Sequence, residues 1–402
     1  MPKMKVLMVS EYFPPYAMGG GEHSAFLLAK NLAKDIDISV LTSWFPGLKN
    51  QETMEGIKVI RKLRTGKDSN SFIGNFGRLF FERSLKRELP KIMHEYDIIH
   101  CMNITSIPAV EVKENVKFIA HVNSPGLFCP KHTLLYKDKE PCERECTRTT
   151  YLDCFLNSEE VGKMQNKPHL KYNPLFIYLA RKRFESYQKN IGKFDLYMAT
   201  SEFMKERLVK IGIDKKKIEV VPNIVEFKPV KRKKNKIPHI LYVGAYLKSK
   251  GPQLLIEALR KVNKEYRCNF YGSGYLKDYL LKKVKEYNLN VQIHDPVPKE
   301  KMPEIYASHD LVVVPSLVGE AFNRVVVEAK AAGCEVIASD VGGMRELVGE
   351  RTISDINLKK LLICMNRKLI CITKDKNKRC INKLKKEKIL IKVKSRYTKT
   401  IN

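Results

Sequence analysis

The sequence predicts an α/β protein with two Rossmann-like domains, each built on a doubly wound parallel sheet, that face a central cleft. Short apolar runs alternate with amphipathic stretches along the 402 residues, which is typical of strand–helix units around a sheet buried on both faces. The chain is also too long for one hydrophobic core. A charged segment with two prolines, residues 226–238, interrupts the alternation and predicts a domain boundary.

Twelve short runs, mostly rich in Val, Ile and Leu, predict the strands in chain order. The runs before the charged segment are Lys5–Ser10, Ile38–Thr42, Ile57–Arg61, Ile98–Cys101, Val116–His121, Leu196–Thr200 and Ile218–Pro222. Those after it are Ile240–Val243, Arg267–Tyr271, Asn290–His294, Leu311–Pro315 and Glu335–Ser339. Amphipathic spacing predicts helices between them at Glu22–Lys34, Glu202–Ile211, Gly251–Lys264, Leu276–Tyr287 and Arg324–Ala332.

These elements predict a division of the chain into domains. We expect a first domain over residues 1–226, a linker over 227–238, a second domain over 239–350 and an atypical lysine-rich tail over 351–402. The first domain contains a cysteine-containing insertion at about residues 125–160. Open α/β sheets bind ligands at the carboxyl ends of their strands, so we expect the functional site in the cleft.

The charge of the chain is strongly positive and unevenly distributed. Residues 351–402 carry 17 Lys and Arg against 3 Asp and Glu, so this segment supplies +14 of the net charge of +30. The remaining +16 suits a protein that meets anionic substrates or an anionic membrane surface, and a general lysine bias of the genome would look the same. No module of interleaved aromatic and basic residues accompanies the charge, so we expect no nucleic-acid partner.

The first residues predict a strand and not a signal sequence, because their apolar run is short and no small-residue cleavage site follows. No run is long enough to span a membrane, so we expect a cytoplasmic protein. Phe72–Lys91 and Leu170–Lys189 have the pattern of basic amphipathic helices, which suits peripheral contact with the inner face of the membrane. Core-facing helices with solvated lysines are the commoner explanation of such a pattern.

Three loops have residues suited to anions. Gly19, Gly20 and Gly21 precede a helix, where backbone N–H groups and the helix dipole favour an anion, although a plain tight turn looks the same. Lys250 lies just before another helix, where its ammonium suits a phosphate held at the helix end; a solvated loop lysine is the alternative. Gly342-Gly343 opens a further loop that the backbone of a neighbour can approach closely.

Two glutamates eight positions apart form the most informative motif. Glu320 lies at the carboxyl end of a predicted strand, and Glu328 is expected about two turns into the following helix. Carboxylates accept hydrogen bonds from vicinal diols, which suits recognition of a sugar and of a ribose. The motif therefore favours a nucleotide-sugar site.

Together these motifs resemble the retaining glycosyltransferases of the GT-B architecture, specifically glycosyltransferase family 4 with its glycosyl transferases group 1 domain. The resemblance extends from about residue 5 to 349 and is most specific in Glu320-x7-Glu328 and the segment EAKAAGCEVIASDVGGMRE. It implies an enzyme of the hexosyltransferase type that moves a sugar from a nucleotide-diphosphate donor to a glycan or lipid-linked acceptor. Such enzymes serve cell-surface polysaccharide or glycoconjugate assembly, and the motif favours transfer over epimerisation of the nucleotide sugar.

The resemblance also implies a role for each matching residue. The catalytic positions are His121 beside the transferred sugar, Lys250 at the diphosphate leaving group and Glu320 at the sugar's hydroxyls. The positions that bind the donor are Gly19 and Gly20 at its phosphate, Phe322 and Asn323 beside the sugar, Glu328 at the ribose, and Gly272 and Gly274 near the base.

The mechanism implied by this layout requires no cofactor. A lysine and a helix N-terminus aimed at the leaving group stabilise the charge that grows on it. Retention of configuration is then explained by front-face attack, in which the leaving phosphate helps to deprotonate the acceptor.

Two features depart from the family pattern. Ala245 stands where many members have an arginine that contacts the diphosphate. Residues 351–402 do not match the family's closing helices, so either this member has diverged or the reading frame shifts near Glu350. A shifted frame favours the alternative function of a catalytically impaired nucleotide-sugar-binding protein.

Four cysteines gather in the insertion: Cys129, Cys142, Cys146 and Cys154. Four thiolates that converge on one point would bind a structural zinc ion. The spacing lacks the usual Cys-x-x-Cys pairs, so free thiols are the alternative.

Overall fold

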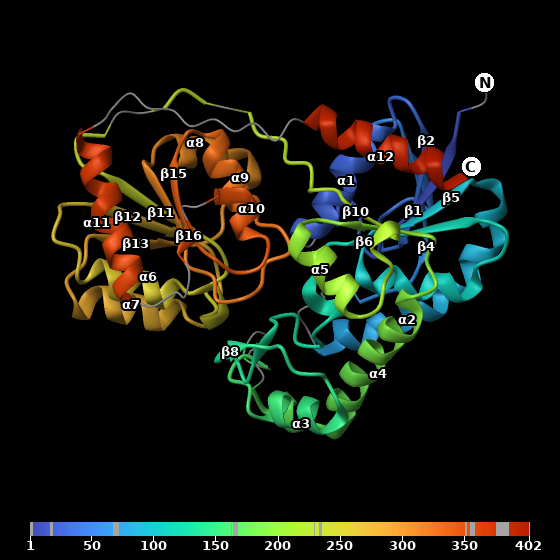
Figure 1. The fold of residues 1–402 in the computed structure, drawn as a ribbon, viewed down its shortest axis with the longest axis horizontal. Helices are drawn as coiled ribbons and strands as arrows, with labels where there is room; N and C mark the ends of the chain where they lie inside the picture. Colours follow the sequence, from blue (N-terminus) through green and yellow to red (C-terminus); the bar gives the residue numbers. More distant parts are fainter. Residues whose placement is uncertain are drawn as a thin grey trace. The chain divides into compact units, whose positions relative to one another are not determined.

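The computed structural model describes residues 3–16, 19–66, 72–161, 163, 168–228, 230–232, 235–349, 352–353, 358–374 and 386–401. The chain divides into two compact units (Figure 1). The first unit contains Met1–His132, Tyr172–Ile224 and Lys385–Asn402, and the second contains Thr133–Lys171 and Val225–Leu384. Each unit holds a wholly or mostly parallel sheet with helices on it, which confirms the predicted α/β class.

The first unit is built on an eight-stranded sheet with the order β10-β9-β6-β5-β1-β2-β4-β3. Its strands are β1 (Lys5–Val9), β2 (Asp37–Ser43), β3 (Gln51–Met54), β4 (Ile57–Leu63), β5 (Ile98–Cys101), β6 (Lys117–Val122), β9 (Leu196–Ala199) and β10 (Ile218–Val220). All neighbours pair in parallel except β3, which pairs antiparallel with β4 at the edge. The sequence did not predict β3, because three of its four residues are polar and half of them are exposed at this edge.

The helices of the first unit are α1 (Gly20–Leu32), α2 (Phe72–Glu88), α4 (Pro174–Ile191), α5 (Glu202–Lys210) and α12 (Lys386–Ile401). Its short 3-10 helices are Leu89–Lys91, Met93–Glu95, η3 (Ile104–Val112), Pro125–Leu127 and Lys215–Lys217, and Pro168–Tyr172 connects the two units. The helices α1 and α12 lie side by side over one face of the sheet (Figure 1), and α2 and α4 both pack against η3.

The second unit is built on a six-stranded parallel sheet with the order β13-β12-β11-β14-β15-β16. Its strands are β11 (His239–Val243), β12 (Arg267–Tyr271), β13 (Val291–His294), β14 (Leu311–Val314), β15 (Glu335–Ser339) and β16 (Thr352–Ile353). The chain runs outward from β11 to β13 and then returns to the middle at β14. The order of strands therefore reverses between β11 and β14, which is the position where open α/β sheets bind ligands.

Helices cover both faces of this second sheet. They are α6 (Pro252–Leu259), α7 (Lys277–Glu286), α8 (Met302–Ala307), α9 (Arg324–Ala331), α10 (Met344–Val348) and α11 (Leu358–Lys374), with 3-10 helices η8 (Lys248–Lys250) and η9 (Lys299–Lys301). Buried residues of α6 and α11 form one core cluster, and those of α8, α9 and α10 form the other.

The insertion adds the hairpin β7 (Leu135–Tyr136) and β8 (Glu140–Pro141) and helix α3 (Arg148–Leu156).

Helix α6 is shorter than predicted. It ends at Leu259 instead of Lys264, and the next residues form a tight turn in which Val262 donates to the carbonyl of Leu259. Val262 and the following Asn263 are residue types with a lower helix propensity than alanine or leucine, which favours the earlier end of α6.

The described parts of the lysine-rich tail are folded. Leu361, Met365 and Leu369 of α11 are buried in the second unit, and α12 buries Ile389, Val393 and Tyr397 in the first. Each set repeats at every fourth residue, so each helix presents one apolar stripe to its core. Such packing is not expected of a sequence read out of frame. Glu350 and residues 354–357 and 375–385 lie outside the described residues.

Candidate active site

Lys250 and Glu320 meet at the reversal point of the second sheet. Lys250 ends η8 after strand β11, and Glu320 lies in the loop after β14. The Lys250 Nζ atom is 2.6 Å from Oε1 of Glu320, and the same oxygen accepts a hydrogen bond from the Ser316 hydroxyl at 3.1 Å. The lysine side chain remains 32% exposed and the glutamate 15%. The structure thus brings together two of the three residues expected to be catalytic, where a ligand can still reach them.

Glycines allow these loops to come this close. Gly251 has φ +73°, and a Cβ there would lie 1.9 Å from the carbonyl oxygen of Pro315. Gly342 has φ +60°, and its Cβ would lie 2.4 Å from the carbonyl oxygen of Glu320. The N–H of Gly343 donates to that carbonyl at 2.7 Å. Because any side chain would separate the loops, the backbone on both sides of Glu320 depends on these glycines.

Glu328 lies just over one turn into α9, not two turns as expected, because it is only four residues after Arg324, where the helix begins as predicted. Asn323 caps the helix by accepting a hydrogen bond from the N–H of Val326 at 3.1 Å, and Phe322 precedes the cap. The Glu328 carboxylate accepts from the Tyr306 hydroxyl at 3.1 Å and from Arg324 at 3.4 Å. These bonds fix its orientation; the role at a ribose stays a prediction.

Gly272 and Gly274 hold the loop after β12 against the loop after β11. A Cβ on Gly272 would lie 1.9 Å from the carbonyl oxygen of Gly244, and one on Gly274, which has φ +152°, would lie 2.5 Å from that of Tyr246. These glycines are therefore required by backbone packing. Their expected place near a nucleotide base stays a prediction.

Two carboxylates that sequence reasoning missed reach the same region from the insertion. Glu159 forms an ion pair with Lys248 at 2.7 Å. The buried Glu160 accepts hydrogen bonds through Oε1 from the N–H of Ser249 at 2.7 Å and from the Tyr275 hydroxyl at 3.3 Å. No sequence signal separates this pair from the other acidic residues of the segment. The insertion thus positions the η8 turn that carries Lys250.

In the first unit, the N-terminus of α1 lies beside the end of β6. Gly19 caps α1, and a Cβ on Gly21 would lie 3.5 Å from the side-chain nitrogen of Asn123, which follows β6. Gly20 is the first residue of the helix. The first N–H groups of a helix have no carbonyl partner within it, so this turn has the chemistry that an anion requires.

His121 lies at the end of β6 on the same side of the sheet as α1 and α12, and only 5% of it is exposed. Its Nδ1 atom is 3.3 Å from Nε2 of His100, a neighbour on β5 that the sequence did not single out. Its Nε2 atom is buried and has no hydrogen-bond partner among the described residues. Burial lowers the pKa of His121 to about 4, so the ring is neutral at pH 7.

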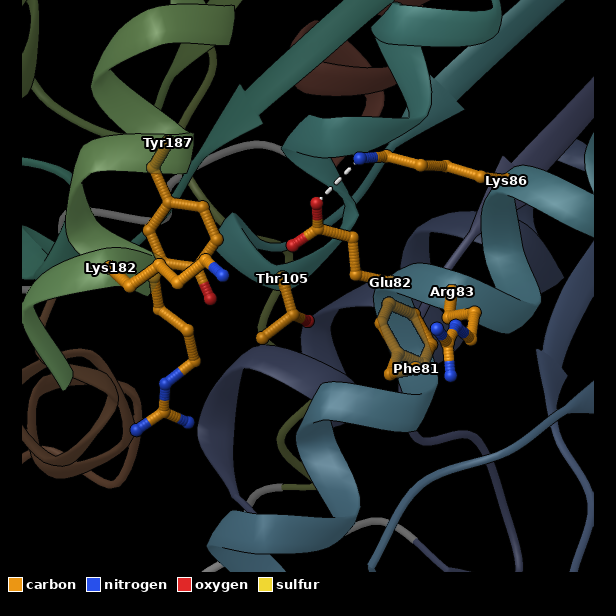
Figure 2. A pocket seen from close by; sticks show the side chains of 8 residues that line it. Phe81, Glu82, Arg83, Lys86, Thr105, Lys182 and Tyr187 are labelled. Carbon is orange, nitrogen blue, oxygen red and sulfur yellow. Dashed lines mark hydrogen bonds and ion pairs between the residues drawn. The ribbon is translucent and has the colours of Figure 1, made fainter. Parts of the chain in front are cut away.

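A basic pocket lies between α2 and α4, with Thr105 of η3 at its base (Figure 2). It has a volume of about 360 Å³ and is lined by Phe81, Glu82, Arg83, Lys86, Thr105, Lys182, Arg183 and Tyr187. Lys86 bonds to Glu82 and Glu111, each at 2.6 Å. Burial opposes the charge of Lys86, but Glu111 and Glu82 outweigh it and raise the pKa of this lysine. The two basic stretches of the sequence thus supply nearly all of its walls.

The cysteines of the insertion form no metal cluster in the structure. Cys129, Cys142, Cys146 and Cys154 are not joined in disulfides, and no group of three or more His, Cys, Asp or Glu side chains within the described ranges is arranged to hold a metal ion. The Cys154 sulfur accepts a hydrogen bond from the N–H of Lys137 at 3.3 Å. A structural zinc ion on these thiols stays a prediction. Among the helices described, none has the length and apolarity required to cross a membrane.

Models of known protein families match both halves of the chain. Residues 18–228 match the family described as Glycosyltransferase Family 4, which is more than half of the chain. Residues 223–358 match the family described as Glycosyl transferases group 1.

Individual proteins agree with these matches. An uncharacterized glycosyltransferase of Methanocaldococcus jannaschii is 24% identical over 86% of this chain and 83% of its own length. The N-acetylgalactosamine-N,N'-diacetylbacillosaminyl-diphospho-undecaprenol 4-alpha-N-acetylgalactosaminyltransferase of Campylobacter jejuni is 31% identical over 39% of this chain and 45% of its own length. The solved structure of sucrose-phosphate synthase from Thermosynechococcus elongatus superimposes with a TM-score of 0.71 at 19% identity, covering 99% of both chains.

Proposed function

The chain belongs to glycosyltransferase family 4, has the GT-B fold and is a glycosyltransferase that uses nucleotide-sugar donors, and from that premise we propose that it transfers a hexose with retention to a lipid-linked or glycan acceptor that carries an anionic group. The observation that carries the proposal is the Lys250–Glu320 pair at the reversal point of the second sheet. Charged groups complementary to a diphosphate and to sugar hydroxyls lie there within one hydrogen bond of each other.

When a nucleotide sugar binds, each residue of this pair can replace its contact with the other by contacts with the ligand. The Lys250 ammonium has three N–H donors that suit a diphosphate, and the Glu320 carboxylate accepts hydrogen bonds from sugar hydroxyls. Without a donor, the two charges neutralise each other at 2.6 Å. A donor replaces this one contact with several, so it compensates for the broken pair. This exchange requires no cofactor.

The transfer step follows from the charge that develops on the leaving group. The bond between the anomeric carbon and the phosphate oxygen breaks, and the acceptor oxygen forms a new bond on the same face. The acceptor proton passes to the leaving diphosphate oxygen. Lys250 and the N-terminus of α6 stabilise the negative charge that grows on the diphosphate. The role of His121 at the transferred sugar stays a prediction from the family resemblance.

The basic pocket supports an anionic acceptor. Four of its eight lining side chains are Lys or Arg and one is a carboxylate, so its charge suits a diphosphate. Large apolar side chains of the same helices, Phe80 and Tyr178, are 53% and 57% exposed. The C. jejuni relative is named for an acceptor joined to diphospho-undecaprenol. We propose a lipid-linked acceptor of this chemical class, met at the inner face of the cell membrane during surface polysaccharide assembly.

The transfer proposal is tested by the configuration of the product. The purified protein is incubated with a nucleotide sugar and a polyprenyl-diphosphate-linked sugar, and the anomeric protons of donor and product are compared by NMR. Transfer with the donor's configuration supports the proposal. An inverted product, or a trapped covalent glycosyl-enzyme intermediate, contradicts it.

The alternative, a catalytically impaired nucleotide-sugar-binding protein, predicts binding without turnover of any donor. Its main support was the atypical tail. The burial of Ile389, Val393 and Tyr397 in the first unit weakens that support, because the described tail completes a core.

A further inference from the structure

A chain of three buried polar side chains connects the last helix to His121. The Tyr397 hydroxyl of α12 is 2.5 Å from Nδ1 of His100, and Nε2 of His100 is 3.3 Å from Nδ1 of His121. Tyr397 and His100 are fully buried. Of the four ring nitrogens of these two histidines, only Nε2 of His121 has no hydrogen-bond partner among the described residues.

The two histidines are neutral, so each ring carries one proton and one lone pair. Burial lowers the pKa of His121 to about 4. Burial, and then the electrostatic effect of a second imidazole at His121, lower the pKa of His100 well below its usual value. Burial also raises the pKa of Tyr397, which keeps its proton. The chain therefore has two directions, and the tyrosine proton distinguishes them.

In the first direction, Tyr397 donates to Nδ1 of His100, and His100 donates from Nε2 to Nδ1 of His121. His121 then carries its proton on Nε2. In the reverse direction, both histidines carry their protons on Nδ1, and the tyrosine oxygen accepts. The hydroxyl proton of Tyr397 would then have no acceptor among the described residues, and an unsatisfied buried donor is costly.

We propose that Tyr397 and His100 are positioning residues that fix His121 in the tautomer with its proton on Nε2, so that His121 meets the substrate as a neutral hydrogen-bond donor and not as a base. The contact with substrate rests on the proposed function; the direction of the chain does not. The hydrogen bond at one imidazole nitrogen decides whether the other nitrogen carries the proton. Tyr397 of the last helix therefore determines whether Nε2 of His121 donates or accepts a hydrogen bond.

Helix α12 is anchored well enough to serve this purpose. Val393 and Ile389 are buried in the core beside Tyr397. Lys392 and Arg396 both pair with Glu219 on β10, and Lys394 pairs with Asp35. The tyrosine therefore approaches His100 from a fixed backbone.

The test reads the protonated nitrogens directly. Long-range proton–nitrogen NMR spectra of the full chain, labelled with ¹⁵N-histidine, distinguish a protonated from an unprotonated ring nitrogen, and the signals of His100 and His121 are assigned by replacing each with glutamine. We expect both rings to carry the proton on Nε2. A proton on Nδ1 of either ring overturns the proposal, and this outcome does not depend on any variant of Tyr397.

A matched pair of variants tests the part played by the tyrosine. Y397F removes only the hydroxyl, and Y197F removes a buried hydroxyl of the same unit that donates to the carbonyl of Ile191 at 2.6 Å. We expect Y397F to shift the Nδ1 signal of His100, change the His121 signals and lower kcat about three- to tenfold with little change in the donor's KM, the worth of one hydrogen bond. Y197F leaves the histidine signals unchanged. Identical histidine spectra for wild type and Y397F overturn the proposal.

The proposed function and this inference can fail separately. If the wild type transfers sugar from no nucleotide sugar but the tautomers are as expected, the proposed function fails and the series of hydrogen bonds stands. If the wild type transfers sugar but Nδ1 of His121 is protonated, only this inference fails.

Discussion

At the scale of single residues, the site depends on charges that are paired but still accessible. Lys250 and Glu320 neutralise each other at 2.6 Å and remain partly exposed, so a donor can separate them. His121 is the opposite case, since it is almost fully buried and its neutral ring is held by His100. In the proposed function, the Lys250–Glu320 pair supplies charge and His121 supplies a hydrogen-bond donor of fixed orientation.

Replacing Lys250 should reduce turnover far more than it reduces stability. We expect Lys250→Ala to lower kcat about 10²–10³-fold, because the ammonium group that stabilises the negative charge on the leaving diphosphate is lost. Lys277→Ala is the matched control, since it breaks an ion pair of the same 2.6 Å length with Asp295. Steady-state kinetics of both variants provide the measurement, and equal losses would contradict the assignment.

The buried histidines should make the protein sensitive to acid. The unfolded chain binds a proton at each histidine near pH 6.5, whereas His121 binds one in the folded state only at about 4. Stability is therefore full above pH 6.5 and is lost as the pH falls through this window, by up to about 1.4 kcal/mol per pH unit for one histidine. Urea unfolding of wild type and His121→Gln across this range should show a smaller loss in the variant. Parallel curves would refute the burial argument.

At the scale of secondary-structure elements, strands and helices were more predictable than the contacts between distant segments. All twelve strands lie where apolar runs predicted them, because a sheet buried on both faces requires such runs. The polar edge strand β3, the short hairpin β7–β8 and the two-residue strand β16 have no such requirement and were missed. His100 and Glu160 were missed for another reason: each acquires its role from residues far away in the sequence, Tyr397 and Ser249.

Helix α12 provides a direct test of whether the tail is a native part of the fold. Ile389 is 7% exposed and packs in the core, whereas Ile391 on the same helix is 66% exposed. We expect Ile389→Ala to lower the free energy of unfolding by about 2–5 kcal/mol, because a buried side chain is removed. Ile391→Ala should change it by less than about 0.5 kcal/mol. Chemical denaturation measures both, and two equally mild variants would show that α12 does not dock as described.

The pocket between α2 and α4 should bind anions through its charge. We expect Arg83→Glu combined with Lys182→Glu to weaken binding of inorganic diphosphate and of vesicles that contain polyprenyl diphosphate, most strongly at low salt. Lys58→Glu makes the same kind of charge change at an exposed residue of the otherwise mostly buried strand β4 and serves as control. Calorimetry measures the diphosphate and flotation measures the vesicles. Unchanged affinity for both ligands would remove the pocket from the proposal.

At the scale of the whole molecule, the two units hold different parts of the proposed site. The second unit holds the Lys250–Glu320 pair at the reversal point of its sheet, and the first holds His121, the N-terminus of α1 and the basic pocket. The sequence predicted the class of fold and singled out Lys250 and Glu320 separately, because strand-end motifs and glycine loops are local, but it did not predict that the two residues contact each other. It did not predict that the tail completes the first unit's core, because that depends on a helix at the opposite end of the chain.

The most direct test of the account is a thermal-shift screen of the full chain with UDP-, GDP-, ADP- and dTDP-sugars, repeated with Lys250→Ala and Glu320→Ala. We expect one donor to raise the melting temperature of the wild type and to be slowly hydrolysed, with both effects lost in the two variants. Donor stabilisation that survives in both variants, or no response of the wild type to any nucleotide sugar, would contradict the claim that this pair forms the donor site.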